Sequence, residues 1–243
     1  MSLPAERPAF YAMPGRGWRA LLTLLHPPYT AMHLSYFALG AAVAPHLHGS
    51  RLGWGLAAFL LAVGVSAHAL DELHGHPLST GLSDRTLIAL ASLGLLGALA
   101  IGVAGILTVT VGLLPFVFAG PLLVVAYNLE LAGGRFHSDL WFALAGGAFP
   151  ALTGYFADAQ RITLSAVLIA AACLATSFVQ RRLSTAAREL RRRTATVEGV
   201  RVRKDGSRET LSVASLLTPL EGALSALWVA VVLTASALVA SRL

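Results

Sequence analysis

Long apolar runs separated by short polar stretches fill the chain from residue 29 onward. Each run has roughly the 20 apolar residues that a helix needs to cross a bilayer. The charge-free stretch 86–129 is long enough for two such helices joined by a tight turn near residues 108–112. The pattern therefore predicts an all-α, polytopic membrane bundle with seven transmembrane helices, at residues 29–45, 52–70, 86–106, 108–131, 140–157, 162–179 and 222–240.

The polar stretches divide the chain into four parts. Residues 1–28 form a predicted N-terminal arm without the long apolar core and cleavage site of a signal peptide. Within it, residues 18–25 could form a short interfacial helix that ends at Pro27 and Pro28. The other parts are a six-helix membrane core at 29–179, a basic loop at 180–219 and a last transmembrane helix at 220–243.

The basic loop begins with a helix-like stretch rich in arginine and then changes character. Apolar and polar residues alternate over 197–203 and again over 208–213, with Asp205 and Gly206 between them. Alternating runs around an Asp-Gly pair predict a β-hairpin with a two-residue turn. The arginines are typical of a topogenic patch facing anionic lipid, and a phosphate clamp over a cavity is the alternative.

Composition excludes a soluble protein. Of the 243 residues, 56% are hydrophobic and only 12% are charged, against roughly 25% charged in an average soluble domain. The mean hydropathy is +0.70. The lone cysteine, Cys173, excludes a disulfide framework and a cysteine-based zinc site.

Charge predicts the orientation. If the N-terminus is cytoplasmic, 15 of the 18 Lys and Arg residues fall on the cytoplasmic side, and only Arg51, Arg161 and Arg242 fall outside. This bias follows the positive-inside rule. We therefore expect a multi-pass protein of the cell membrane with a cytoplasmic N-terminus, whose basic excess faces lipid and not nucleic acid.

Polar groups gather where three predicted helices end on the cytoplasmic side. His68, Asp71 and Glu72 are spaced so that they share one face of a helix. The fourth helix and its loop add further polar groups, and the first helix adds one imidazole; these residues are Tyr127, Asn128, Glu130, Arg135, His137, Asp139 and His33. Because polar groups inside spans usually face the bundle interior, we predict one shared polar cavity.

The residue types leave the chemistry of this cavity open. Carboxylates suit Mg²⁺, whereas the added imidazoles favour Zn, Fe or Mn. His74, His76 and Asp84 lie in the loop after the second helix and are typical of a solvated loop.

The stretch Ala67-His68-Ala69-Leu70-Asp71, followed by Pro77-Leu78-Ser79-Thr80-Gly81-Leu82-Ser83, resembles the UbiA superfamily of intramembrane prenyltransferases. In that family the second helix ends in an Asn-Asp-x-x-Asp motif, and an Arg-Pro-Leu-x-x-Gly-x-Ser stretch follows. His26-Pro27-Pro28 and the glycine-rich fifth helix are similar to family features as well. The resemblance covers about residues 25–179.

The resemblance implies a UbiA-like fold and a metal-dependent transferase. Such an enzyme moves a prenyl group from a polyprenyl diphosphate, ionised by Mg²⁺ on two Asp-rich motifs, to a lipophilic acceptor in the membrane. In this chain His68 stands at the first Asp, and Gln180-Arg181-Arg182 stands at the second motif. His68, Asp71 and Glu72 would then be catalytic, and the expected substrate contacts are Tyr127, Asn128, Arg135, Arg181 and Arg182.

Three functions therefore compete. In a divergent prenyltransferase, Asp71 and Glu72 hold a metal, Glu130 or Asp139 supplies another oxygen, and arginines replace the second metal. In a membrane metalloenzyme acting on a lipid, Fe, Mn or Zn is bound by His33, His68, Asp71, Glu72, Glu130 and His137. A small-solute or ion carrier would use the same cluster as a relay, and a structural or assembly role is the remaining possibility.

Overall fold

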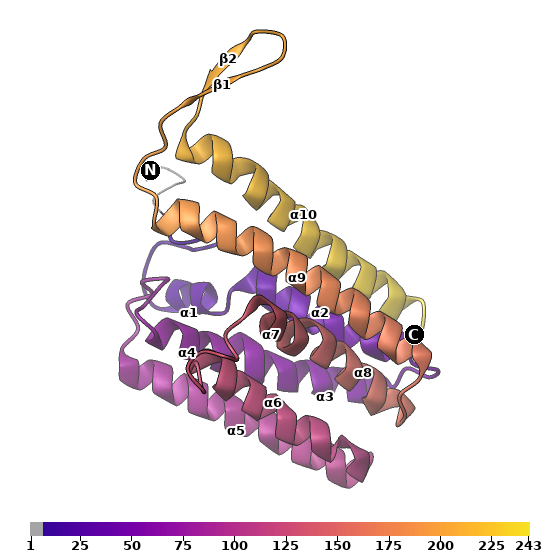
Figure 1. Ribbon diagram of the computed structural model, residues 1–243. Helices are drawn as coiled ribbons and strands as arrows, with labels where there is room; N and C mark the ends of the chain where they lie inside the picture. Colours follow the sequence, from indigo (N-terminus) through magenta and orange to yellow (C-terminus); the bar gives the residue numbers. More distant parts are fainter. Residues whose placement is uncertain (1–6) are drawn as a thin grey trace.

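The computed structural model describes residues 7–243 as a bundle in which successive long helices run in opposite directions (Figure 1). The helices are α1 (Trp18–Leu24), α2 (Pro27–Val43), α3 (Gly49–Phe59), α4 (His68–Leu73), α5 (Asp84–Thr108), α6 (Leu114–Asn128), α7 (Asp139–Ala143), α8 (Phe149–Ala159), α9 (Leu164–Arg192) and α10 (Val213–Ala240). Two short strands, β1 (Val200–Val202) and β2 (Arg208–Thr210), lie between α9 and α10.

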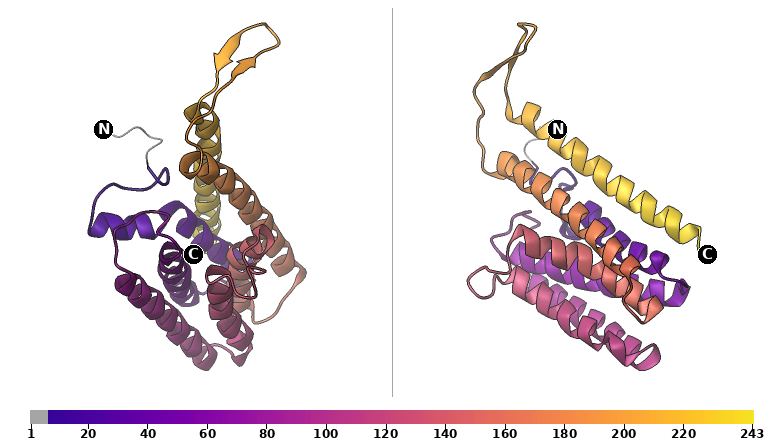
Figure 2. Two further views of the ribbon diagram at one scale, coloured as in Figure 1. Left: turned by 60° about the vertical axis from the view of Figure 1, so that its left-hand side comes forward. Right: turned by 45° about the vertical axis from the view of Figure 1, so that its right-hand side comes forward.

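The bundle has two distinct ends. The arginine end is formed by loops 74–83 and 129–138 and by the carboxyl end of α9, and the far end by loops 44–48 and 160–163. The N-terminal arm lies at the arginine end, whereas the chain finishes at the far end (Figure 1). α9 and α10 cover one side of the bundle, α5 and α6 cover the opposite side, and the other long helices lie between them (Figure 2).

Six helices in residues 7–243 are long and apolar enough to cross a membrane. They are Gly49–Leu73, Asp84–Thr108, Val111–Asn128, Asp139–Ala159, Leu164–Arg192 and Val213–Ala240. Each of them leaves most of its apolar window unburied inside the bundle, as expected for helices whose outer faces meet lipid. The architecture is that of a multi-pass, all-α membrane protein, as the apolar runs predict.

Helix α2 runs through the centre of the bundle and is buried at most positions. It packs against α8 on one side and α10 on another. Gly40 of α2 and Gly154 of α8 lie where the two backbones touch, and a Cβ on either glycine would collide with Ala151 O or Phe37 O. Glycine is therefore required at this crossing, because it alone lets the helix axes approach so closely.

Two of the long helices contain a π-helical segment. Leu60–Ala67 joins α3 to α4, and Leu144–Ala148 joins α7 to α8. A π-helical segment adds a residue to the turn and shifts the faces on which the following side chains lie, and such segments occur often at functional sites. Here each precedes or contains residues that line the central cavity, including His68 and Gly146.

The basic segment differs from the predicted boundaries. α9 continues through the arginine-rich stretch to Arg192. Residues 180–192 therefore extend the helix predicted at 162–179 and do not belong to a loop. α10 begins at Val213 and includes Pro219. Ser212 and Ser215 form a capping box at its start.

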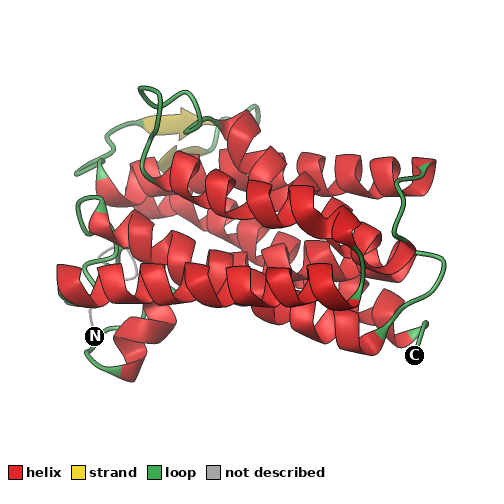
Figure 3. Ribbon diagram, turned by 90° about the horizontal axis from the view of Figure 1, so that it is seen from below, coloured by secondary structure: helices red, strands yellow, loops and turns green. Residues whose placement is uncertain are grey.

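The predicted β-hairpin is confirmed. β1 and β2 pair antiparallel, with Val202 opposite Arg208, and the hairpin projects from the helices (Figure 1). Figure 3 shows its strands in yellow among the red helices. The loop is longer than the two residues predicted: Arg203 N–H donates to Ser207 O, and Gly206 N–H donates to Arg203 O. Gly206 has φ +83°, which is typical of a three-residue hairpin loop with glycine in the left-handed region.

The N-terminal arm folds back over the arginine end, and its residues 1–6 lie outside the described chain. α1 forms within the predicted stretch 18–25. Pro27 and Pro28 begin α2 as its first two residues, because proline has no N–H to lose there. The guanidinium groups of Arg191 and Arg192 donate to Arg7 O and Pro8 O, at 3.1 and 3.0 Å, and so fix the arm onto α9.

Candidate functional site

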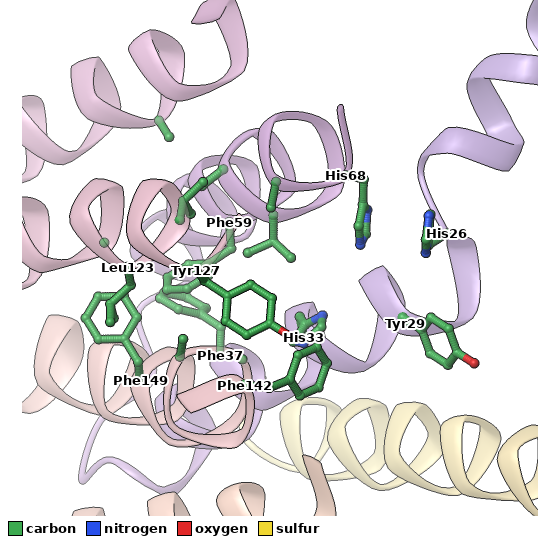
Figure 4. A pocket seen from close by; sticks show the side chains of 18 of the residues that line it. His26, Tyr29, His33, Phe37, Phe59, His68, Leu123, Tyr127, Phe142 and Phe149 are labelled. Atoms are coloured by element: carbon green, nitrogen blue, oxygen red, sulfur yellow. The ribbon is translucent and has the colours of Figure 1, made fainter. Parts of the chain in front are cut away.

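A single large cavity of about 1420 Å³ runs through the bundle between α2, the α3–α4 helix, α5, α6, the α7–α8 helix and α9. Aromatic and small apolar side chains make up its middle (Figure 4). Polar side chains line it at the arginine end, including Tyr11, His26, Tyr29, His33, His68, Asp71, Tyr127, Asn128, His137, Gln180, Arg181, Ser184, Thr185, Arg188 and Arg192. Side chains from four helices, two loops and the arm therefore meet in one space.

His68 and His26 form a stacked pair in this polar part. Their ring centroids are 4.1 Å apart and their planes differ by 8° (Figure 4). His68 Nδ1 lies 3.2 Å from Gly64 O and 3.5 Å from Thr30 Oγ1, whose own hydrogen is donated to Leu25 O. Because a carbonyl oxygen only accepts, Nδ1 of His68 carries the ring hydrogen. Its Nε2 is therefore the basic nitrogen.

His26 is held neutral beneath the arm. Its Nδ1 lies 2.9 Å from the Tyr11 hydroxyl. Burial, followed by the nearby His68, Arg192 and Arg188, lowers the pKa of His26 well below its usual value. Burial and Tyr29 raise the pKa of Tyr11, and Asp71 adds to the rise whereas Arg192 and Arg188 oppose it. These groups thus lie within electrostatic reach of one another.

Glu72 does not face the cavity. Its carboxylate is fully buried and accepts hydrogen bonds from Leu78 N, Thr80 N and Thr80 Oγ1, each at 2.9 Å. Consecutive residues on a helix point about 100° apart. Asp71 therefore faces the cavity while Glu72 faces loop 74–83, and the carboxylate stabilises that loop.

Asp71 is the acid of α4 that lines the cavity. In residues 7–243, two other carboxylates, Glu189 and Glu221, line the same space. Glu221 is paired with Arg191 through two contacts of 2.7 Å, and Glu189 lies 3.6 Å from Arg193. Asp71 has no such partner in the described chain.

The end of α6 and its loop contribute aromatic groups to the cavity and little charge. The Tyr127 ring stacks on His137, with centroids 4.5 Å apart, and His137 Nδ1 lies 3.2 Å from Tyr127 O. The Tyr127 hydroxyl is buried without a hydrogen-bond partner among residues 7–243 and points toward His33 (Figure 4). Asn128 lines the cavity and donates to Val124 O at 2.8 Å.

The charged residues of that loop lie elsewhere. Glu130 is half exposed, 3.8 Å from His137 Nδ1, and does not line the cavity. Arg135 is exposed and also lies off the cavity wall. Loop 129–138 therefore places these two predicted site residues off the cavity wall.

Arginines of α9 supply positive charge at the arginine end. Arg181 and Arg188 are seven residues apart and so share one helical face, and both line the cavity. Arg181 donates to Asp139 Oδ1 at 3.2 Å and covers the Phe142 ring, 5.1 Å from its centroid. Arg182 lies 3.3 Å from Asp139 Oδ2 but is 68% exposed and points away. Of the three arginines predicted to contact substrate, Arg135, Arg181 and Arg182, only Arg181 lines the cavity.

The sequence reasoning did not single out Arg188. Its guanidinium is partly buried and donates to Thr185 Oγ1 at 3.2 Å. No carboxylate in residues 7–243 lies within ion-pair distance of it. The seven-residue spacing from Arg181 was the signal that could have identified it, once the stretch was known to be one continuous helix.

The donors do not fit the two-metal site that the resemblance implies. No group of three His, Cys, Asp or Glu residues suited to a metal ion occurs within the described range 7–243. A histidine nitrogen binds a metal in the plane of its ring, so the parallel rings of His26 and His68 do not converge on one ion. His33, His68, Asp71 and His137 line the same cavity, but Glu72, Glu130 and Asp139 do not line it.

The cavity also reaches the far end, where His48 and Arg51 line it. His48 Nδ1 lies 3.1 Å from the buried carboxylate of Asp158, and Arg51 donates to Ala157 O at 3.1 Å. These contacts fasten the start of α3 to the end of α8. Between the two ends the wall is apolar and includes Phe37, Phe59, Leu95, Phe116, Leu123 and Phe149.

The chain matches no known family model, no curated protein sequence and no solved structure.

Proposed function

We propose that the protein is a UbiA-like intramembrane prenyltransferase whose cavity holds a polyprenyl diphosphate. The diphosphate lies at the arginine end, beside Arg181 and Arg188, and the prenyl tail lies along the apolar wall toward the far end. One observation carries this proposal: a single cavity of about 1420 Å³ combines a cationic end with a long aromatic and aliphatic wall. That division of polarity matches a molecule with an anionic head and a greasy tail.

In the proposed reaction, the bond between C1 of the prenyl group and the diphosphate oxygen breaks, and the diphosphate leaves with the electron pair. A lipophilic acceptor captures the allylic cation and loses one proton. The guanidinium groups stabilise the charge that develops on the leaving group. The apolar wall excludes the water that would otherwise capture the cation, and aromatic faces such as those of Tyr127 and Phe142 attract positive charge.

The proposed orientation places the arginine end in the cytoplasm. That end carries the charged arm, loops and hairpin, whereas the far end carries Arg51, Arg161 and Arg242. α2 has 17 residues, about 26 Å at 1.5 Å per residue, which is close to the hydrocarbon thickness. With α2 as a seventh span, the N-terminus is cytoplasmic and the C-terminus lies outside.

The alternatives fit the cavity less well. A metalloenzyme needs the histidines and carboxylates to converge, but Glu72 and Glu130 face away from the cavity. An ion carrier needs polar groups along its whole path. The cavity does reach His48 and Arg51, but its middle is lined by Phe, Leu, Ala and Gly. This middle suits a lipid tail better than an ion.

The test is a transfer assay on the purified protein in nanodiscs. Tail-labelled farnesyl diphosphate is added with a total membrane lipid extract as the pool of acceptors, and both released diphosphate and labelled lipid are measured. We expect diphosphate release together with a new labelled lipid. Arg181→Gln should reduce both by about 10- to 100-fold, as for loss of a charged hydrogen bond, whereas Arg182→Gln should not. Absence of both products from the wild-type protein would refute the proposal.

A further inference from the structure

We infer that the phosphate head of the substrate is bound directly by the guanidinium groups of Arg181 and Arg188, without a bridging divalent cation. This inference rests on the proposed function, because it concerns how the same cavity holds a prenyl diphosphate. It differs from what the UbiA resemblance implies, where Mg²⁺ bound to two Asp-rich motifs carries the diphosphate.

The arrangement of the two arginines supports direct binding. Arg181 is only 12% exposed and is fixed by Asp139 and the Phe142 ring. Arg188 lies two turns further along the same face, and its guanidinium donates to the hydroxyl oxygen of Thr185. Among residues 7–243 no carboxylate forms an ion pair with this partly buried guanidinium, which is costly, and Arg188 lines the cavity. Guanidinium groups bind phosphate oxygens through paired hydrogen bonds.

The carboxylates at the same end do not suit a cluster of metal ions. Glu221 is taken by Arg191, and Glu189 lies beside Arg193. Among the cavity-lining carboxylates of residues 7–243, Asp71 alone remains, and it lies within electrostatic reach of Arg188. A single carboxylate cannot hold two Mg²⁺ ions. Asp71 forms no ion pair with Arg188, so an incoming phosphate becomes the anionic neighbour of the arginines.

These two modes of binding give opposite predictions for Asp71→Asn. If Mg²⁺ bridges the phosphate to Asp71, the substitution removes the metal ligand and weakens binding. If the arginines bind the phosphate directly, the substitution removes a repulsive charge, and binding stays the same or becomes tighter. The neutral amide has nearly the same shape as the carboxylate, so the variant is expected to fold.

The experiment measures the Kd of the full-length protein in nanodiscs for farnesyl diphosphate, once in excess EDTA and once in excess Mg²⁺, with farnesol as the uncharged control. We expect similar affinity for farnesyl diphosphate in both conditions and weaker binding of farnesol. Arg188→Gln should weaken farnesyl diphosphate binding by about 10- to 100-fold and leave farnesol binding unchanged, which also shows that the variant is folded. Arg182→Gln, whose side chain points outward, is the matched control.

The outcomes separate the inference from the proposed function. If farnesyl diphosphate binds only with Mg²⁺ and Asp71→Asn abolishes that binding, the inference is overturned. The proposed prenyltransferase function is not contradicted by this result. Metal-free binding that depends on Arg188, but without turnover, supports the inference and contradicts the transferase. Inorganic diphosphate and phosphatidic acid serve as competitors: displacement by inorganic diphosphate supports a diphosphate site, and displacement by phosphatidic acid alone assigns it to a bilayer lipid head. No binding in either condition overturns both.

Discussion

Neighbouring residues of α4 have unrelated roles although their side chains have the same chemistry. Asp71 and Glu72 are consecutive acids, but one faces the cavity and the other accepts three hydrogen bonds from Leu78 and Thr80. The same contrast holds for Arg181, which is 12% exposed, and Arg182, which is 68% exposed. A site residue in this protein is therefore defined by the direction of its side chain and not by its charge.

Buried His26 makes the stability of the fold depend on pH. Its pKa is lowered well below 6.5 by burial and by His68, so the unfolded chain binds more protons than the folded one when the pH falls below about 6.5. The free energy of unfolding should then decrease with acidification, by up to about 1.4 kcal/mol per pH unit. Thermal unfolding in detergent between pH 8 and pH 5 measures this.

In that experiment His26→Gln removes the titrating ring. The midpoint temperature of unfolding should then change less with pH than in the wild-type protein. His74→Gln alters an exposed histidine of loop 74–83. In this variant the unfolding midpoint should change with pH as much as it does in the wild-type protein. An equal slope in all three proteins would show that His26 is not the group responsible.

At the scale of elements, close packing of α2 against α8 fixes the geometry of the cavity. The backbones touch at Gly40 and Gly154, and α2 places His33 and Phe37 on the cavity wall. Gly146 in the second π-helical segment likewise makes room for the His33 ring, since a Cβ there would lie 2.5 Å from His33 Nε2. Small residues thus decide how far side chains from neighbouring helices reach into the cavity.

Adding a methyl group at the α2–α8 crossing should destabilise the protein. In Gly40→Ala or Gly154→Ala the new Cβ meets backbone atoms of the facing helix, and overpacking of this kind costs about 1–3 kcal/mol. Gly53→Ala is the control, because nothing lies within 4 Å of the added Cβ and alanine favours a helix by about 0.5–1 kcal/mol over glycine. Unfolding midpoints in detergent should fall in the first two variants and rise slightly in the third.

At the scale of the whole molecule, charge and polarity are divided between the two ends of the bundle. The arginine end holds the arm, the hairpin and the polar part of the cavity, and the far end holds contacts between the C-terminus and α2. There Arg242 donates to Ala42 O and Ala44 O, at 3.0 and 2.7 Å, and joins the C-terminus to α2. Under the proposed function and orientation, a substrate with an anionic head enters from the arginine end or from the inner leaflet.

The orientation can be tested by labelling single cysteines with a membrane-impermeant maleimide. Cys173 is buried, so the wild-type protein is the unlabelled control. His46→Cys at the far end should be labelled on intact cells, and Lys204→Cys in the hairpin should be labelled only after the cells are permeabilised. Labelling of Lys204→Cys on intact cells would contradict the orientation, and labelling of both from one side would contradict an odd number of spans.

The sequence by itself determined the class of protein, the approximate positions of the apolar helices and the β-hairpin. These follow from local chemistry: in a bilayer every backbone group must be satisfied within the segment, so apolar length alone predicts a helix, and alternation around Asp205-Gly206 predicts paired strands. The sequence also indicated that His68, Asp71, Tyr127 and Arg181 belong to polar stretches at the same predicted depth in the membrane.

Only the tertiary structure decided which of these groups meet. Helical periodicity places residues on a face, but whether that face meets a cavity, a loop or lipid depends on the packing of distant segments. Glu72 is taken by residues of the following loop, Arg135 is turned outward, and Arg188 joins the site because α9 continues without a break. These contacts join residues from separate helices and loops, so no local pattern encodes them.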